Sequence, residues 1–84
     1  MLVDVIEANY VGNYRLHLVF ENGVHGIVDL ESCVREGGVF TALADPEFFS
    51  QAAVDRKLGT VHWPNGADIS PEFLYQCLQP AGTV

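Results

Sequence analysis

Basic side chains are scarce in this sequence. Its 84 residues hold four lysines and arginines against eleven aspartates and glutamates, which gives a formal net charge of −7. A DNA duplex carries one charge per ~1.7 Å of axis, and proteins that bind it neutralise several phosphates. Direct nucleic-acid binding by this chain is therefore not expected, whereas a small basic protein would be an electrostatically favourable partner.

Cysteines and long apolar runs are also rare. Cys33 and Cys77 lie far apart without a C-x-x-C pair, so neither a disulfide framework nor a zinc knuckle is expected. No run approaches the ~20 apolar residues of a membrane helix. Asp4 and Glu7 interrupt the start of the chain too early for a signal peptide. These absences predict a cytoplasmic protein that does not associate with membranes.

Cofactor and metal motifs are missing as well. The glycines lack the G-x-G-x-x-G or G-K-S/T context of a phosphate loop. His17, His25 and His62 show none of the recurrent zinc-ligand spacings, and His17 is expected on the sheet face opposite to His25. We therefore predict neither a cofactor nor a metal ion. Both cysteines are expected to be inert, and acidic neighbours should raise the pKa of the Cys33 thiol.

The first half of the chain predicts three antiparallel strands. Residues 2–11 form the first, and residues 14–20 alternate strictly between apolar and polar side chains. Asn22-Gly23 signals a two-residue type I′ turn into a third strand over residues 24–30. That turn would place Leu18 opposite Ile27 and Leu16 opposite Asp29. The predicted core face carries Leu16, Leu18, Phe20 and Ile27.

Short helices are expected after these strands. A helix over residues 31–36 should stop at Gly37-Gly38. Asp45-Pro46-Glu47 and Ser70-Pro71-Glu72 share the pattern of a capped helix start. Pro80 and Gly82 should end the last helix. The expected core anchors are Val39, Phe40 and Leu43 in the middle of the chain, and Leu74, Cys77 and Leu78 near its end.

Residues 60–75 are the most informative stretch. Pro64, Asn65 and Gly66 suit the corners of a three-residue hairpin loop, with a positive φ at the glycine. This loop pairs His62 with Asp68 on the outer face and turns the Trp63 indole inward, together with Val61 and Ile69. The whole pattern predicts a single α+β domain over residues 1–84. It has a small antiparallel β-sheet (a three-stranded meander plus a later hairpin) and two or three short helices.

The run W-P-N-G-A-D-I-S-P-E-F-L-Y at residues 63–75 resembles the signature of bacterial domain of unknown function 2442. Weaker patterns over residues 14–23, 28–30 and 39–43 fit the same family, so the resemblance spans about residues 3–78. It implies an α+β domain without established enzymatic activity and supplies no catalytic residue. The residues of the signature turn and helix cap are Trp63, Pro64, Asn65, Gly66, Ser70, Pro71, Glu72 and Tyr75.

The resemblance also bears on partners. Some relatives carry a C-terminal helix-turn-helix extension, and others are encoded beside small toxin-like proteins. Because the sequence ends at Val84, we expect it to lack that extension. An open sheet edge would in addition allow strand addition or homodimerisation.

Two groups of side chains are candidates for function. His62 and Asp68 could form an acid–base unit or an ordinary polar pair. Asp68 could instead bond backbone groups near the start of the last helix. Trp63, Phe73 and Tyr75 could form an aromatic binding patch, although small domains usually place large aromatic rings in their own core.

The sequence leaves three functions open. The first is a non-enzymatic protein-interaction or regulatory module, with an antitoxin-like partner of a small basic protein as one form. The second is a small ligand-binding domain or enzyme that uses His62 and Asp68. The third is the accessory half of a transcription regulator. The acidic charge, the lack of a catalytic motif and the neighbourhood of some relatives favour the first.

Overall fold

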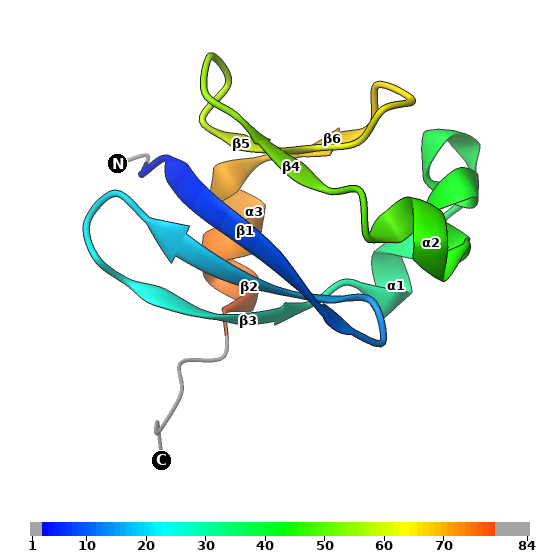
Figure 1. The fold of residues 1–84 in the computed structure, drawn as a ribbon, viewed down its shortest axis with the longest axis horizontal. Coiled ribbons are helices and arrows are strands. Elements are labelled where there is room, and N and C mark those ends of the chain that lie inside the picture. The colour runs from blue at the N-terminus through cyan, green and yellow to red at the C-terminus, as the bar shows by residue number, and fades with distance from the viewer. Residues whose placement is uncertain (1–2, 79–84) are drawn as a thin grey trace.

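The chain forms two small antiparallel sheets that share a core with short helices. The structure, a computed structural model, describes residues 3–78. Figure 1 shows the second sheet above the first, α3 behind the first sheet, and α1 and α2 at one end. The α+β class and the antiparallel pairing are as predicted. The strands are β1 (Val5–Gly12), β2 (Arg15–Phe20), β3 (His25–Asp29), β4 (Ala53–Asp55), β5 (Thr60–His62) and β6 (Asp68–Ile69), and the helices are α1 (Glu31–Val34), the 3₁₀ helix η1 (Gly38–Ala44), α2 (Pro46–Phe49) and α3 (Pro71–Cys77).

The first sheet has the order β1-β2-β3. β1 starts later than the predicted residue 2, which lies outside the described residues. The loop between β1 and β2 consists of Asn13 and Tyr14, whose φ values of 52° and 59° have the signs of a type I′ turn. The Tyr14 hydroxyl donates to the Ala44 carbonyl, and its ring meets Phe49 edge-on at 5.4 Å between centroids. These contacts hold a bulky residue in a left-handed conformation.

The loop between β2 and β3 differs from the prediction. Phe20 N donates to Val24 O at 2.8 Å, and Gly23 N donates to Phe20 O at 2.9 Å. Of the residues at positions 21–23, only Gly23 has a positive φ, of 87°. The loop therefore has three residues, a type I turn closed by a left-handed glycine, where we predicted a two-residue type I′ turn.

This longer loop moves the register by one residue. Leu16 lies opposite Val28 and Leu18 opposite Gly26, so the predicted pairs with Asp29 and Ile27 are wrong. Because side chains alternate across a strand, the slip exchanges the two faces of β3. Val28 is buried in the core, and Ile27 is half-buried on the outer face.

The helical middle of the chain matches the predicted capping pattern. α1 begins at Glu31 as predicted and ends slightly earlier than expected. Asp45 caps α2, because its side chain accepts a hydrogen bond from the Glu47 amide. Leu43 is buried and Phe40 half-buried, while the side chain of Val39 lies outside the described structure. Among residues 3–78, no helix is long and apolar enough to cross a membrane.

The second sheet adds a strand that the sequence did not reveal. β4 pairs with β5, which pairs with β6 as predicted, with His62 opposite Asp68. Val5 N donates to Gly59 O at 2.9 Å, which joins the start of β1 to the turn between β4 and β5. β4 has only three residues, too few to show the alternation of apolar and polar side chains that predicts a strand. Its place in the sheet is set by its pairing with β5.

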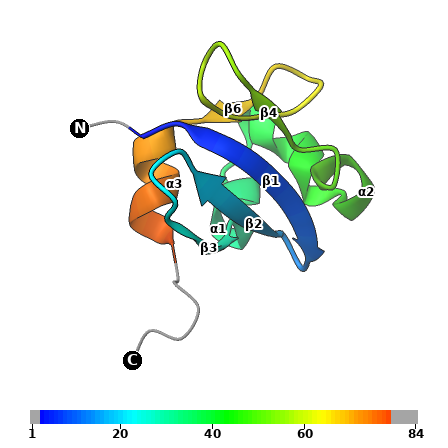
Figure 2. The same cartoon turned by 60° about the vertical axis from the view of Figure 1, so that its left-hand side comes forward.

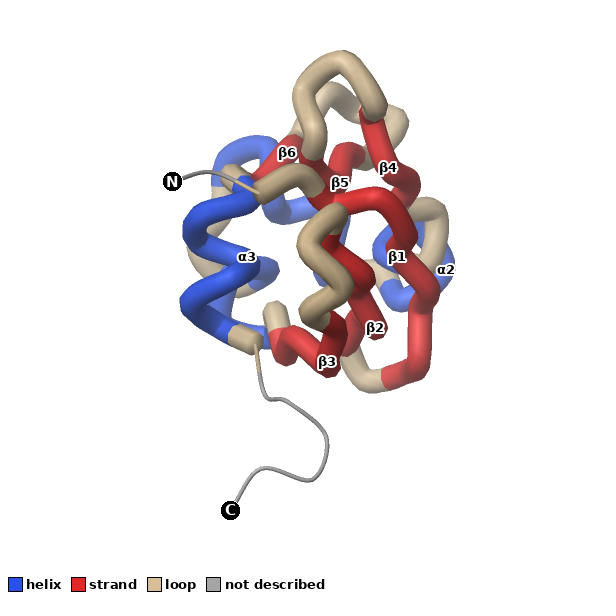
Figure 3. Tube along the Cα trace, turned by 90° about the vertical axis from the view of Figure 1, so that its left-hand side faces the viewer, coloured by secondary structure: helices blue, strands red, loops and turns tan. Residues whose placement is uncertain are grey.

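The core lies between the two sheets, α2 and α3. Trp63 is only 1% exposed, and its indole Nε1 donates to the Phe49 carbonyl at 2.9 Å. Leu74 anchors α3 to the same cluster of buried side chains. Figures 2 and 3 show α3 standing against one side of the first sheet. α3 ends at Cys77, before the predicted stop at Pro80 and Gly82, which lie outside the described residues.

Candidate functional site

The signature residues of the hairpin mainly build structure. Gly66 has a φ of 90° and donates its amide to Trp63 O at 3.0 Å. The Asn65 side-chain oxygen accepts from the Ala67 amide at 3.1 Å. Pro64 is exposed beside them. The predicted loop is therefore confirmed, and its role is to bury the indole and direct the chain into α3.

The remaining signature residues start α3 and present its outer surface. Ser70 Oγ accepts a hydrogen bond from the Phe73 amide at 3.2 Å, and Pro71 occupies the first turn. This start fixes the direction of the helix. Glu72 and Tyr75 of α3 are exposed, and both line a pocket together with Val3, near the N-terminus.

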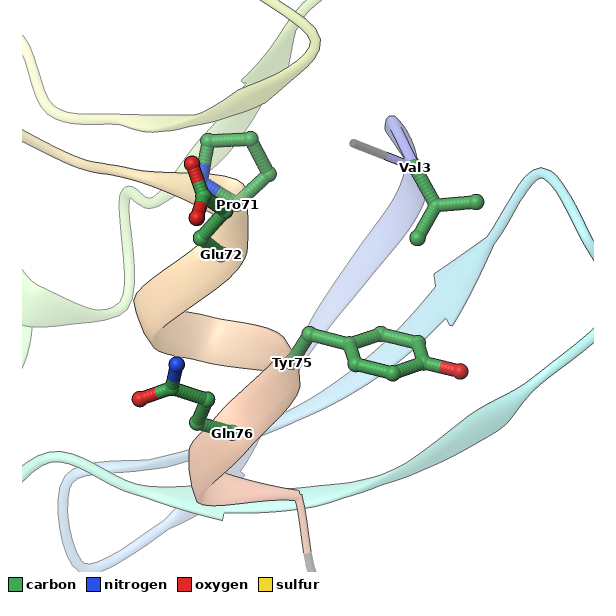
Figure 4. A pocket seen from close by; sticks show the side chains of 5 residues that line it. All are labelled: Val3, Pro71, Glu72, Tyr75 and Gln76. Atoms are coloured by element: carbon green, nitrogen blue, oxygen red, sulfur yellow. The ribbon is translucent and has the colours of Figure 1, made fainter. Parts of the chain in front are cut away.

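A small pocket lies beside α3. Its volume is about 140 Å³, well below the roughly 300–1,000 Å³ of small-molecule sites. Figure 4 shows Tyr75 extending from the helix beneath Val3, with Glu72 and Gln76 one turn apart on the helix. A space of this size could accommodate a single side chain. It is lined by Val3, Pro71, Glu72, Tyr75 and Gln76.

The two sides of the pocket differ in chemistry. The Tyr75 ring meets Phe20 edge-on at 5.0 Å between centroids, and its hydroxyl accepts from Asn22 Nδ2 at 3.4 Å. Tyr75 is therefore held in one orientation by contacts within the chain. Glu72 is exposed, and within residues 3–78 no hydrogen bond or ion pair engages its carboxylate. The pocket thus combines a fixed aromatic wall with an available negative charge.

Exposed carboxylates outnumber exposed cations on the rest of the surface. Every aspartate and glutamate except Asp55 is exposed. Across the described range, a single ion pair forms, between Arg35 and Glu31 at 2.6 Å. Most of the negative charge is therefore not neutralised by this chain's own cations.

The predicted pair of His62 and Asp68 is adjacent in register, but no hydrogen bond or ion pair joins the two side chains in the described residues. The two residues face each other across β5 and β6, with His62 half-buried and Asp68 exposed. In the described part of the chain, no hydrogen bond or ion pair joins the imidazole to the carboxylate. The bond proposed between Asp68 and the backbone near Ser70 is not formed either. The geometry of an acid–base unit is therefore not assembled here.

The Cys33 side chain is buried and that of Cys77 is half-buried. Cys33 and Cys77 are both free. Burial raises the pKa of the Cys33 thiol, with further contributions in the same direction from the charge of Glu36 and from Cys77. A raised pKa keeps less of the thiol in its nucleophilic form. Burial is the largest cause of the raised pKa of Cys33, whereas the sequence had suggested its acidic neighbours.

The aromatic candidates divide between core and surface. Trp63 is buried, while Phe73 is 42% and Tyr75 37% exposed. The sequence singled out Pro71, Glu72 and Tyr75 only as signature and cap residues, and it predicted neither the pocket nor the part that Val3 and Gln76 take in it. Val3 comes from the opposite end of the chain, and no local pattern signals its approach to α3.

These features define a small acidic α+β domain with a pocket of side-chain size. The family model described as protein of unknown function (DUF2442) matches residues 5–77. The chain therefore belongs to this family, as the signature over residues 63–75 indicated. No curated protein and no solved structure matches the chain.

Proposed function

We propose that this domain is a non-enzymatic protein-interaction module that binds a basic protein partner through the α3 pocket. The observation that carries the proposal is the exposed Glu72 carboxylate beside the oriented Tyr75 ring. The partner would insert one lysine or arginine side chain. Its aliphatic stem would pack on Pro71 and Tyr75 while its charged group pairs with Glu72.

The charge of the whole molecule supports the same partner chemistry. A net charge of −7 attracts a basic protein over a distance and raises the association rate, with strong dependence on salt. The pocket would then select the docking orientation. An antitoxin-like pairing with a small basic protein encoded next to this domain is the form we favour. The free thiols of Cys33 and Cys77 are compatible with the cytoplasmic location expected for such a pair.

No contact favours the alternative uses. An enzyme or ligand-binding domain built on His62 and Asp68 would need their side chains to cooperate, and within residues 3–78 no hydrogen bond or ion pair joins them. Neither is there a structural observation that specifically supports an accessory half of a transcription regulator.

The test is co-expression with the product of the adjacent gene. The two proteins should elute together in size-exclusion chromatography at low salt, and calorimetry should show weaker binding as the salt concentration rises. Separate elution at low salt would refute the proposed pairing.

Glu47 offers a matched control for the site itself. It follows the proline of a capped helix start, as Glu72 does, and is likewise exposed. Glu72→Gln should weaken binding about tenfold, as expected when a charge-assisted hydrogen bond is lost. Glu47→Gln, with the same change in net charge, should alter binding less than about twofold. Equal effects of the two substitutions would mean that general charge, and not the pocket, carries the interaction.

A further inference from the structure

The corrected register brings two histidines together on the outer face of the first sheet. His17 of β2 lies opposite Ile27, and Val19 lies opposite His25 of β3. The histidines therefore occupy one diagonal of a four-residue square, and Val19 and Ile27 occupy the other. His17 Nε2 is 3.2 Å from His25 Nδ1, and the ring centroids are 5.3 Å apart. The expectation that the sheet separates these two side chains is wrong.

We infer that His17 and His25 form a two-histidine chelate for a divalent transition-metal ion such as Zn²⁺ or Ni²⁺. Imidazole nitrogens are preferred ligands of these ions, at about 2.0–2.1 Å for zinc. Two nitrogens 3.2 Å apart, each at that distance from one ion, subtend an angle of roughly 100° at the metal. This value is close to the tetrahedral angle. Small rotations of the two rings would therefore suffice to direct both lone pairs at the ion.

Metal binding rearranges the ring protons of His17 and His25 without changing their number. In the free pair, one of the two facing nitrogens donates a hydrogen bond and the other accepts it. Metal binding needs a lone pair on both. The donor ring therefore exchanges tautomer through solvent, so that the protons reside on His17 Nδ1 and His25 Nε2. Both rings stay neutral, and each facing nitrogen forms a bond to the metal.

The surroundings allow an ion to approach. His25 is exposed and His17 half-buried. Phe20, on the opposite face of β2, packs against Tyr75 of α3, so the histidines lie on the face away from that helix. Within residues 3–78, no group of three potential ligands gathers anywhere. The two remaining positions of a tetrahedral ion would therefore be filled by water.

His62 provides an internal control: it is the third histidine of the chain, it lies on β5 of the second sheet, and within residues 3–78 no hydrogen bond or ring contact joins it to the other two. Untagged protein is stripped with a chelator and titrated with Zn²⁺ or Ni²⁺ by calorimetry. We expect His17→Gln and His25→Gln each to lower the affinity at least about tenfold, and His62→Gln to change it less than about twofold. Far-UV circular dichroism confirms that each variant is folded.

A second measurement does not depend on the variants. Substoichiometric Cu²⁺ added to the wild-type protein should broaden the imidazole NMR signals of His17 and His25 and spare those of His62. Equal broadening of all three would overturn the inference. So would a wild-type affinity for Zn²⁺ and Ni²⁺ within threefold of that of the protein lacking both His17 and His25.

Discussion

Replacing Trp63 by phenylalanine tests the central packing arrangement of the molecule. The indole is almost fully buried, contacts the Phe49 ring at 5.5 Å between centroids, and donates its Nε1 hydrogen to the Phe49 carbonyl. Phenylalanine keeps an aromatic ring at the site but removes the donor and part of the volume. The substitution therefore separates this particular indole geometry from general hydrophobicity.

The expected loss of stability follows from these contacts. The Phe49 carbonyl also accepts from the Ala52 amide at 3.1 Å, so it keeps one partner and only the hydrogen bond itself, about 1 kcal/mol, is lost. The smaller ring leaves a cavity of about 40 Å³, which costs about 1 kcal/mol more. The free energy of unfolding should fall by about 2 kcal/mol, out of roughly 4–12 kcal/mol for a domain of this length.

Urea denaturation followed by far-UV circular dichroism gives the free energy, since the variant loses the chain's single tryptophan. Thermal unfolding should show Tm lower by roughly 8–16 °C. Phe73→Leu, at an exposed aromatic position on α3, is the control and should cost less than about 0.5 kcal/mol. A loss below about 0.5 kcal/mol for Trp63→Phe, or equal losses for both variants, would refute the buried, hydrogen-bonded indole.

Three further predictions concern the backbone and a thiol. Gly59→Ala should cost about 2 kcal/mol, because φ is +68° and the new Cβ would clash with the Asp4 carboxylate, whose side chain must change rotamer. Gly66→Ala, with φ +90° and open space around it, should cost only about 1 kcal/mol. Equal Tm shifts for the two variants would contradict the role of the Asp4 contact. Ser70→Ala should cost about 1 kcal/mol in urea denaturation through loss of the α3 cap, and a negligible change would rule out the cap. Since its pKa is raised by burial, Cys33 should react with a maleimide more slowly at pH 8 in the native protein than in urea, and equal rates would contradict its burial.

Local turn chemistry explains which parts of the fold could be predicted. The loop over residues 64–66 carries a proline, an asparagine and a glycine at positions that each favour one corner, so its length and register were right. The caps Asp45 and Ser70 are equally local signals. In both cases the residues that determine the structure are neighbours in sequence.

The errors come from competition between similar turns and from long-range contacts. Asn22-Gly23 fits a two-residue turn, but it also fits the end of a three-residue loop, in which Asn22 Oδ1 accepts from the Val24 amide at 3.1 Å. The second solution forms, and one residue of slip brings His17 and His25 to the same face. The pocket was missed for a different reason, because Val3 reaches α3 only through the tertiary fold.

The turn at Asn13 and Tyr14 has a consequence for how the first hairpin forms. A tyrosine with φ near +59° is less stable by about 1–2 kcal/mol than one in a right-handed conformation. The interactions that offset this penalty come from Ala44 and Phe49, some thirty residues further along the chain. An isolated peptide of residues 5–20 should therefore populate other loop conformations. During synthesis, we therefore expect the first hairpin to reach its final shape only after the segment around residue 49 has emerged and docked.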